Sequence, residues 1–507
     1  MTDTTHFEVL IIGAGLSGIG AACHLVREDA TTNFAILERR EAIGGTWDLF
    51  TYPGVRSDSD MLTFGYGFRP WVGTKVLADG PSIKSYVEQT AAEFGVTDRI
   101  RFGRRVTKFS WSSQDDLWTV EATAADQREV YTCRFLVGAT GYYNYDQGFR
   151  PKFPGEESFG GQIVHPQFWP ADLDHTGKNV VIIGSGATAI TLVPSMAKDA
   201  AHVTMLQRSP SYVMPVPETD PVASPLARIG VPARLIHRFG HRRNVLLQQG
   251  LYKFCRANPR LARRVLLGVA RRQLRGKVDM AHFTPSYNPW DERLCVVPNG
   301  DLFKTLRDGE ASIVTDHIET FTETGIRTKS GEEIPADLVV SATGLQIQLA
   351  GGASIEVDGE PVVVQDRLLY KGVLMEGVPN AMFVVGYTNA SWTLKADLAS
   401  AYLCRLLKHM ASQGHTRVVP TATDAPHDEA SILGDSMRSG YIQRGNSVMP
   451  RQGKAAPWRI FNDYYKDTPM LLRQSITDDA LQFSTTSSAT TSTATTNASV
   501  SDESVAV

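Results

Sequence analysis

Two glycine-rich segments have the residue types and spacing that suit phosphate binding. Residues 13–18 read GAGLSG and residues 184–189 read GSGATA, each between an apolar run and a stretch with helical spacing. Glycine permits a tight turn there, and backbone N–H groups at the start of the following helix can approach a pyrophosphate. Both segments therefore predict a dinucleotide site, with a purely structural turn as the alternative at the first.

The residues about twenty positions after each turn indicate which dinucleotide binds. Glu38 follows the first turn, and its carboxylate can accept both hydroxyls of an adenosine ribose while repelling a 2′-phosphate, which suits FAD or NAD. Arg208 and Ser209 follow the second turn, where a guanidinium and a hydroxyl can hold a 2′-phosphate. An ordinary surface arginine is the alternative for Arg208. Together the two sites predict FAD plus NADPH, and hence a flavoprotein that takes hydride from NADPH.

The elements around the two turns follow one plan, which occurs twice. Each turn lies in a strand–helix–strand unit that is followed by an antiparallel meander and a buried strand ending in ATG. This duplication predicts an α/β fold with two Rossmann-like dinucleotide-binding domains, the second inserted within the first. The expected elements after the first turn are a helix over 16–28, a strand over 34–38, a meander over 106–132 and a strand over 135–141; those after the second include strands over 202–209 and 338–344 and a meander over 325–337.

The predicted domain boundaries follow from this plan. An FAD-binding domain is expected at residues 1–145 and 331–483, and an NADPH-binding domain at 146–330 with a helical insertion over 215–290. Residues 484–507 contain 14 Ser or Thr among 24 residues and almost no apolar bulk. Such a segment cannot bury enough apolar surface to fold, so we expect a disordered tail.

The helical insertion has an unusual charge pattern. From Arg228 to Lys277 the sequence contains 14 Lys or Arg and no Asp or Glu. One interpretation is a solvated helical face whose acidic partners lie elsewhere in the fold. The other is peripheral contact with anionic lipid.

Composition excludes several classes of protein. The formal net charge is −3 with 21% charged residues, so we expect no nucleic-acid partner. The five cysteines are far apart and include no CxxC pair, which predicts neither a disulfide framework nor a metal site and excludes a flavin disulfide reductase. Together with an N-terminus that lacks the basic region of a signal peptide, this indicates a reducing compartment, the cytoplasm. The uncharged runs over 9–25 and 180–197 are not membrane spans, because a glycine turn interrupts each one.

Two further motifs carry a resemblance to a known family. Residues 159–170 read FGGQIVHPQFWP, which fits the pattern FxGxxxHxxxWP, and residues 44–58 fit GGxWxxxxYPGxxxD. On this scaffold the chain resembles the flavin-dependent Baeyer–Villiger monooxygenases over nearly its whole length to about residue 480. It is most similar to the bacterial subgroup that includes the ethionamide-activating monooxygenase.

The resemblance implies a reaction and a set of site residues. Members use FAD, NADPH and O₂ to insert oxygen beside a ketone carbonyl or to oxidise the sulfur of a thioether. Arg293 occupies the position of the family's active-site arginine, with a structural salt bridge as the alternative, and Asp58 is expected to orient it. The fingerprint residues Phe159, Gly161, His165 and Trp169 are expected to link the domains. The implied FAD contacts are Gly13, Gly15, Ser17, Gly18, Glu38, Thr46, Trp47, Asp48, Leu49, Arg56, Ser57, Asp58, Ser59 and Val106; the implied NADPH contacts are Asp58, Gly184, Ser185, Gly186, Ala187, Thr188, Ala189, Ile190, Arg208 and Ser209.

One position departs from the members that act on cyclic ketones. Those have a lysine before the arginine, whereas this chain has Glu292. Either Arg208 holds the phosphate alone, with a weaker preference for NADPH, or another cation contributes. Two other functions remain open: an S- or N-oxygenating flavin monooxygenase without ketone chemistry, and an NADPH oxidase or reductase.

Overall fold

The first strand–helix–strand unit forms as the sequence predicts. The structure is a computed structural model, which describes residues 4–423, 425, 427–433 and 439–485. The apolar run before the first turn is β1 (Thr5–Ile12), the helix is α1 (Leu16–Glu28) and the next strand is β2 (Phe34–Leu37). β1 pairs in parallel with β2, as a right-handed crossover through a helix requires. The predicted α/β fold class is confirmed.

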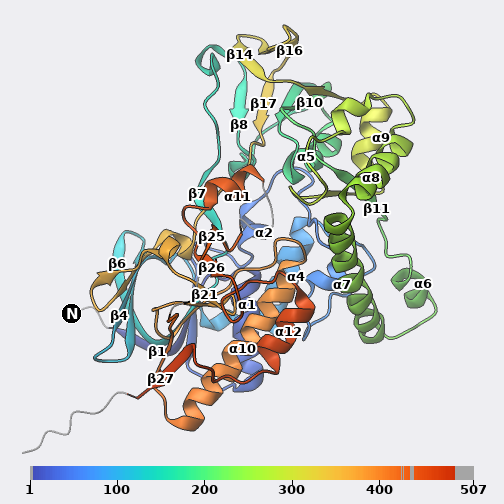
Figure 1. The fold of residues 1–507 in the computed structure, drawn as a ribbon. Helices are drawn as coiled ribbons and strands as arrows, with labels where there is room; N and C mark the ends of the chain where they lie inside the picture. Colours follow the sequence, from blue (N-terminus) through green and yellow to red (C-terminus); the bar gives the residue numbers. More distant parts are fainter. Residues whose placement is uncertain (1–3, 424, 426, 434–438, 486–507) are drawn as a thin grey trace, which may run out of the picture.

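The first unit belongs to an eleven-stranded mixed sheet (Figure 1). The predicted meander forms, but its third strand and the strand expected over 135–141 are one continuous strand, β6 (Gln127–Gly138). Residues 127–133 of β6 pair antiparallel with β5, residues from 131 to 138 pair parallel with β1, and no turn residue interrupts the strand. The other strands of the sheet are β3 (Ile100–Arg101), β4 (Arg105–Ser112), β5 (Leu117–Ala124), β19 (Ser354–Val357), β20 (Glu360–Pro361), β21 (Leu369–Tyr370), β22 (Leu374–Met375) and β23 (Ala381–Phe383).

The second glycine turn belongs to a separate five-stranded sheet. Its strands lie in the order β13-β10-β9-β17-β8, and each neighbouring pair is parallel. A three-stranded meander, β14 (Ile318–Thr322), β15 (Gly325–Thr328) and β16 (Glu333–Pro335), lies beside it. The strands and helices of this unit are β8 (Gln162–Val164), β9 (Asn179–Ile183), α5 (Ala187–Met196), β10 (His202–Gln207), α9 (Asp301–Arg307), β13 (Ala311–Thr315) and β17 (Leu338–Ser341).

The chain passes between the two sheets through a pair of adjacent segments. β7 (Tyr143–Gly148) leaves the first sheet and β18 (Leu345–Ile347) returns to it, and the two pair antiparallel. The predicted boundary at residue 330 is therefore too early, because β16 and β17 lie with the second unit and the return comes after Ser341. β17, which has the sequence LVVS, pairs in parallel with β9, just as β6 pairs in parallel with β1. This pairing places β17 inside the second sheet.

The segment expected to be a helical insertion is helical only in its middle. Three helices form, α6 (Ala223–Arg228), α7 (Ala233–Ala257) and α8 (Pro259–Leu274). Before them β11 (Val213–Val216) pairs with β12 (Cys295–Pro298), and residues 275–290 are mostly irregular apart from a short 3₁₀ turn. Proline explains why the first part of the segment is not helical, since Pro215, Pro217 and Pro221 disfavour a helix interior. Among the described residues no helix has the length and apolar character that crossing a bilayer requires.

The last part of the chain covers the first sheet. α10 (Trp392–Gln413) packs against α1, and α12 (Tyr464–Leu472) packs against α10. The predicted tail over 484–507 lies outside the described residues from 486 onward, whereas Ser484 ends β27 (Leu481–Ser484) and pairs with Arg417. The remaining elements are α2 (Thr46–Leu49), α3 (Met61–Phe64), α4 (Gly80–Glu93), β24 (Arg417–Pro420), β25 (His427–Ser431), α11 (Gly440–Gly445) and β26 (Arg451–Gly453).

Candidate active site

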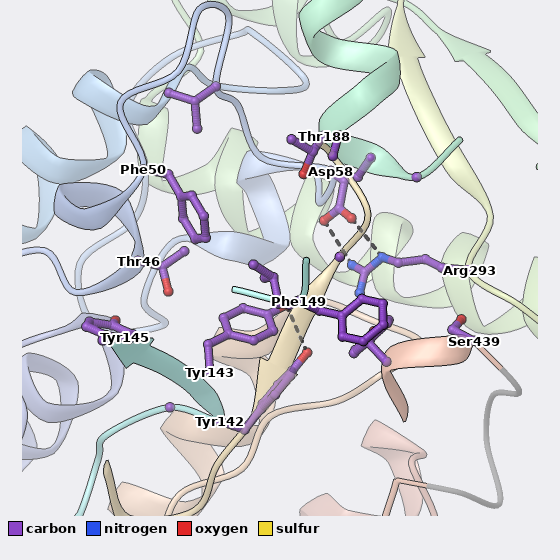
Figure 2. Close-up of a pocket in the computed structure, with 18 of the residues that line it drawn as sticks. Thr46, Phe50, Asp58, Tyr142, Tyr143, Tyr145, Phe149, Thr188, Arg293 and Ser439 are labelled. Carbon is purple, nitrogen blue, oxygen red and sulfur yellow. Dashed lines mark hydrogen bonds and ion pairs between the residues drawn. The ribbon is translucent and has the colours of Figure 1, made fainter. Parts of the chain in front are cut away.

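A cavity of about 900 Å³ joins the two glycine turns. Its wall includes residues from the β1–α1 turn, the β9–α5 turn, the loop before α3 and the start of α11. Figure 2 shows Asp58 of the loop before α3, Thr188 of α5 and Ser439 next to α11. This volume lies at the upper end of the range for small-molecule sites. The two predicted dinucleotide sites thus open into one space.

The first turn leaves the start of α1 free to bind an anion. The backbone of Gly13 has φ +105°, and a Cβ there would lie 2.8 Å from the carbonyl oxygen of Ala139. Gly15 is the N-cap residue of α1, where no side chain caps the helix and no acidic residue lies in the first turn. The first N–H groups of α1 therefore remain available to a phosphate group, which the helix dipole also favours.

Glu38 lies at the end of β2 on the cavity wall, although it is almost completely buried. Its Oε2 accepts a hydrogen bond of 2.7 Å from the N–H of Ala14, and its Oε1 accepts one of 2.8 Å from the N–H of Arg40. Burial raises the pKa of this carboxyl, against the lowering effect of the two backbone N–H groups. The backbone bonds fix the carboxylate beside the turn, where it can also accept the hydroxyl groups of a ribose.

The second turn has the same backbone form with a more open cradle. A Cβ on Gly184, which has φ +140°, would lie 2.4 Å from the carbonyl oxygen of Ala342, whereas a Cβ on Gly186 would meet no atom within 4 Å. Gly186 is the N-cap of α5 and again no side chain caps the helix. Arg208 and Ser209 follow β10 and line the same cavity, with Arg208 exposed to solvent. This end of the cavity can therefore hold a second phosphate-bearing molecule.

Glu292 lies near the arginine that was predicted to bind phosphate. Burial raises the pKa of Glu292, and the opposing charge that lowers it comes first from Arg208. Both residues line the cavity. The departure noticed in the sequence thus places a carboxylate, in place of a second cation, in the electrostatic field of Arg208.

Arg293 and Asp58 form an ion pair inside the cavity (Figure 2). Arg293 Nε lies 2.7 Å from Asp58 Oδ2, and Arg293 Nη2 lies 2.9 Å from Asp58 Oδ1. Each side chain is about 30% exposed, so the pair borders the open space rather than lying in the core. The carboxylate of Asp58 raises the pKa of Arg293 above its ordinary value. The pair therefore fixes a permanent cation whose position is set by two hydrogen bonds.

Aromatic side chains beside Arg293 form a wall that the sequence analysis did not single out. Tyr142, Tyr143, Tyr441 and Trp392 line the cavity. The hydroxyl groups of Tyr142 and Tyr143 lie 3.3 Å apart, and the Tyr142 ring is 5.1 Å from the Trp392 ring. Tyr142 and Tyr143 directly follow the strand ending in ATG. Because ligands bind at the carboxyl ends of parallel strands, this place in the sequence could have identified both as site residues. Tyr441 comes from α11, and no local pattern indicates its position.

Trp392 connects this aromatic wall to the first turn. Its Nε1 donates a 2.7 Å hydrogen bond to the hydroxyl oxygen of Ser17 in α1. Gln348 also lines the cavity, and its Oε1 is buried with no hydrogen-bond partner among the described residues. A buried acceptor without a partner costs free energy, so this oxygen fits a site that a polar ligand completes.

Most of the residues expected to contact cofactors lie together in the cavity wall, but four do not. Asp48 is held by Arg40 and Lys84, at 2.5 and 2.7 Å, and Leu49 packs in the core of the second unit. Gly18 and Ala189 face the helix packing rather than the cavity; a Cβ on Gly18 would lie 1.8 Å from the carbonyl oxygen of Gly13. The expected contacts that line the cavity are Gly13, Gly15, Ser17, Glu38, Thr46, Trp47, Arg56, Ser57, Asp58, Ser59, Val106, Gly184, Ser185, Gly186, Ala187, Thr188, Ile190, Arg208 and Ser209.

One fingerprint residue, His165, lies at the connection between the two sheets. His165 Nε2 lies 3.2 Å from the carbonyl oxygen of Gly344, and its Nδ1 accepts a hydrogen bond from the N–H of Gln167. A Cβ on Gly148 would lie 2.2 Å from the His165 ring, so this glycine allows close packing of the two segments. Burial lowers the pKa of His165, which keeps the ring neutral with its proton on Nε2. His165 thus contacts both connecting segments of the chain.

The contacts of the other fingerprint residues lie in the second unit rather than at the connection between the sheets. The ring of Phe159 packs edge-on against Phe321 of β14 at 5.7 Å, and a Cβ on Gly161 would lie 2.5 Å from the carbonyl oxygen of Asp337. Trp169 packs at the edge of the core of the second unit. None of the four lines the cavity.

The chain is similar to one family model and to two named monooxygenases. A family model described as "Pyridine nucleotide-disulphide oxidoreductase" matches residues 10–226, although all five cysteines of this chain are buried and free. MymA of Mycobacterium tuberculosis, named as an FAD-containing monooxygenase, is 56% identical over 489 residues, which cover 95% of this chain and 98% of MymA. The FAD-containing monooxygenase EthA of the same organism is 47% identical and covers 95% and 98% of the two chains.

A solved structure shares the whole fold. It is a steroid monooxygenase bound to NADP, which matches with a TM-score of 0.75 over 95% of this chain and 100% of its own. The sequences are 21% identical, so this match concerns the fold alone.

Proposed function

The chain belongs to the FAD-containing monooxygenases, and from this membership we propose that it is a Baeyer–Villiger monooxygenase, which uses NADPH and O₂ to insert one oxygen atom beside a ketone carbonyl. The relatives bear out the family resemblance predicted from the two motifs. The ketone reaction is supported by one observation above all, the Arg293–Asp58 pair inside the cavity. Oxidation of thioethers is the second activity that we assign to the same site.

The residues around the first turn fit FAD. The uncapped start of α1 offers N–H donors for the pyrophosphate, and Glu38 offers a carboxylate for the ribose hydroxyls. Trp392 and Ser17 are joined by a hydrogen bond at the edge of this site. When bound, the flavin accepts hydride and activates O₂ for transfer to the substrate.

The residues around the second turn fit NADPH. The open cradle at Gly186 and the uncapped start of α5 can bind a pyrophosphate, while Arg208 and Ser209 can bind the 2′-phosphate. Because Glu292 lowers the local positive potential, we infer a weaker preference for NADPH over NADH than two cations would give.

Arg293 supplies the positive charge that ketone oxygenation needs. Attack of a nucleophilic oxygen on a ketone carbonyl leaves negative charge on the carbonyl oxygen, and a fixed cation stabilises that charge without reorganising. Asp58 holds the guanidinium through two N–H groups, which keeps the remaining N–H groups directed at other partners in the cavity. Tyr142, Tyr143 and Tyr441 line the same cavity, and their rings lower the effective dielectric beside this cation, which strengthens its effect.

Product analysis tests this function directly. Purified holoenzyme is given NADPH, O₂ and a panel of linear and cyclic ketones and thioethers, while NADPH consumption, hydrogen peroxide and organic products are measured together. Esters or lactones support the proposal. Sulfoxides or N-oxides with no ester would identify a heteroatom monooxygenase, and hydrogen peroxide with no oxygenated product would identify an NADPH oxidase.

A further inference from the structure

The helices α6, α7 and α8 present a surface with two unusual properties, and this surface lies along one side of the molecule (Figure 1). The first is charge. Residues 228–277 contain 14 of the 51 Lys and Arg and none of the 54 Asp and Glu. The rest of the chain, with 37 Lys and Arg against 54 Asp and Glu, therefore has a net charge of −17.

The acidic partners that a solvated helical face would require are mostly missing. Three of the 14 basic residues form ion pairs, Arg243 with Asp220, Lys253 with Asp463 and Arg256 with Asp291. Ten of the others are exposed and have no ion-pair partner within the part of the chain that the structure describes. The charge of this surface is therefore not neutralised by the fold.

The second property is exposed apolar bulk on the same helices. Of the thirteen exposed large apolar side chains among the described residues, eight lie between residues 222 and 265. On α7, Leu235, Phe239 and Leu246 are each more than half exposed. Spacings of four and seven residues put them on one face of the helix, and Arg242 lies in the same stripe. On α8, Leu261 and Val265 are likewise exposed at a spacing of four, beside Arg264.

We propose that α7 and α8 form a docking surface for the anionic surface of a phospholipid membrane. Basic residues attract anionic headgroups, and leucine and phenylalanine side chains enter the boundary between headgroups and acyl chains. A nucleic acid would use the charges but would gain little from the exposed leucines. A second copy of this surface would bring like charges together, which disfavours a symmetric dimer through it.

The surface is fixed firmly to the region of the active site. The Asn244 side chain of α7 donates a 2.7 Å hydrogen bond to Asp60 Oδ1, and the Gln248 side chain donates to the other oxygen of the same carboxylate. Asp60 caps α3 and lies two residues after Asp58. The apolar stripe of α7 points away from these contacts, so membrane binding leaves them intact.

Vesicle binding tests the proposal with the full holoenzyme. The protein is sedimented with vesicles of phosphatidylcholine alone or mixed with phosphatidylglycerol, over a range of salt. We expect binding only to the mixed vesicles. Binding should weaken as salt increases, because the Debye length falls from about 30 Å at 0.01 M to about 8 Å at physiological ionic strength.

Two variants separate the charge from the apolar contribution. The triple variant Arg234→Gln, Arg238→Gln, Arg242→Gln should bind mixed vesicles on the order of 100-fold more weakly, since three charges close to the lipid are removed. The variant Phe239→Ser, Leu246→Ser should still bind at low salt but should lose the binding that persists at physiological salt. A matched control removes three exposed lysines without ion-pair partners among the described residues, Lys152→Gln, Lys198→Gln and Lys329→Gln, and should bind as the wild type does.

Three results of the binding measurements would overturn the proposal. No binding of the wild type to mixed vesicles at low salt, or an equal loss in the triple variant and its lysine control, would each refute it. Stronger binding to single-stranded RNA than to vesicles, unaffected by Phe239→Ser and Leu246→Ser, would assign the surface to a polyanion. Flavin absorbance and thermal unfolding of each variant are measured alongside, so that a misfolded variant is replaced by its single substitutions.

Discussion

Arg293 and Asp58 are separated by 235 residues in the chain, yet two of the Arg293 nitrogens lie within 2.9 Å of the two Asp58 carboxylate oxygens. Asp58 comes from the loop after α2, and Arg293 from the loop before β12. The ion pair therefore joins the segment next to the first glycine turn to the unit that contains the second. Because both side chains border the cavity, the pair also places a cation in the space that the two predicted dinucleotide sites share.

The arginine after β10 should govern the choice of coenzyme. If Arg208 binds the 2′-phosphate, Arg208→Ala removes a charge-assisted contact worth about 1.5 to 3 kcal/mol, which NADH does not make. The ratio of kcat/KM for NADPH over NADH should therefore fall roughly 10-fold to 100-fold. Steady-state kinetics with both coenzymes measure this ratio. Equal losses for NADPH and NADH would remove Arg208 from the phosphate site.

Glu292, the residue before Arg293, should oppose the same preference. Glu292 lies in the field of Arg208, and its substitution by lysine replaces a repulsive charge with an attractive one at the predicted phosphate site. Glu292→Lys should raise the NADPH over NADH ratio, and Glu292→Gln should raise it by a smaller amount. Fluorescence titration of both coenzymes gives the affinities independently of turnover. An unchanged ratio in Glu292→Lys would show that the side chain does not face the phosphate.

The sequence predicted the parts of this fold that depend on local patterns. Helix α1 begins and ends at the predicted residues, because a glycine turn and a helical spacing specify it locally. The return to the first sheet after Ser341, by contrast, depends on the pairing of β17 with β9, which brings together residues more than 150 positions apart. Tyr441 was missed for the same reason, since it meets Tyr142 only through tertiary structure.

Attachment of α7 should make the protein sensitive to acid. Burial, with a smaller effect of the neighbouring His241, lowers the pKa of His237 from 6.5 to about 4. As the pH falls, the unfolded chain therefore binds a proton on this histidine near pH 6.5, whereas the folded chain binds it only near pH 4. The contribution of this group to the free energy of unfolding is complete above pH 6.5 and is lost as pH falls towards 4. The loss should be about 3 kcal/mol.

Comparison with a variant isolates this contribution from that of other titrating groups. His237→Gln keeps a polar side chain of similar size that does not titrate. The difference in unfolding free energy between wild type and variant, measured by urea denaturation across this pH range, should shrink as pH falls. A difference that stays constant with pH would contradict the lowered pKa.

A buried ion pair should hold the last two long helices together. Lys395 of α10 and Asp467 of α12 lie 2.9 Å apart with both side chains almost fully buried, and the Tyr387 hydroxyl donates to the same carboxylate at 2.8 Å. Lys395→Met leaves a buried charge without its partner, which should cost about 3 to 5 kcal/mol. Thermal unfolding should show the loss, and the double variant Lys395→Met, Asp467→Leu should recover part of it. No recovery would mean that packing around Lys395, rather than its charge, sets the stability.

Substitution of Arg293 should separate oxygenation from flavin reduction at the site itself. Reduction needs the two dinucleotides held next to each other, and we propose that the two glycine turns do this without Arg293. Arg293→Ala should therefore still bleach the flavin when NADPH is added without oxygen, at a rate that stopped-flow absorbance measures. Ketone oxygenation needs the fixed cation, and loss of one preorganised electrostatic contact of this kind costs on the order of 10²-fold to 10³-fold.

The Arg293→Ala enzyme should accordingly consume NADPH while forming little ester, with the oxygen appearing as hydrogen peroxide. Thioether oxidation should suffer less, because sulfur attacks an electrophilic oxygen and leaves no carbonyl anion to stabilise. Arg293→Lys should recover part of the ester formation, since it keeps the charge but only one of the two bonds to Asp58. Full ester formation by Arg293→Ala would make the ion pair a structural bridge between the two units and would move the reaction centre elsewhere in the cavity.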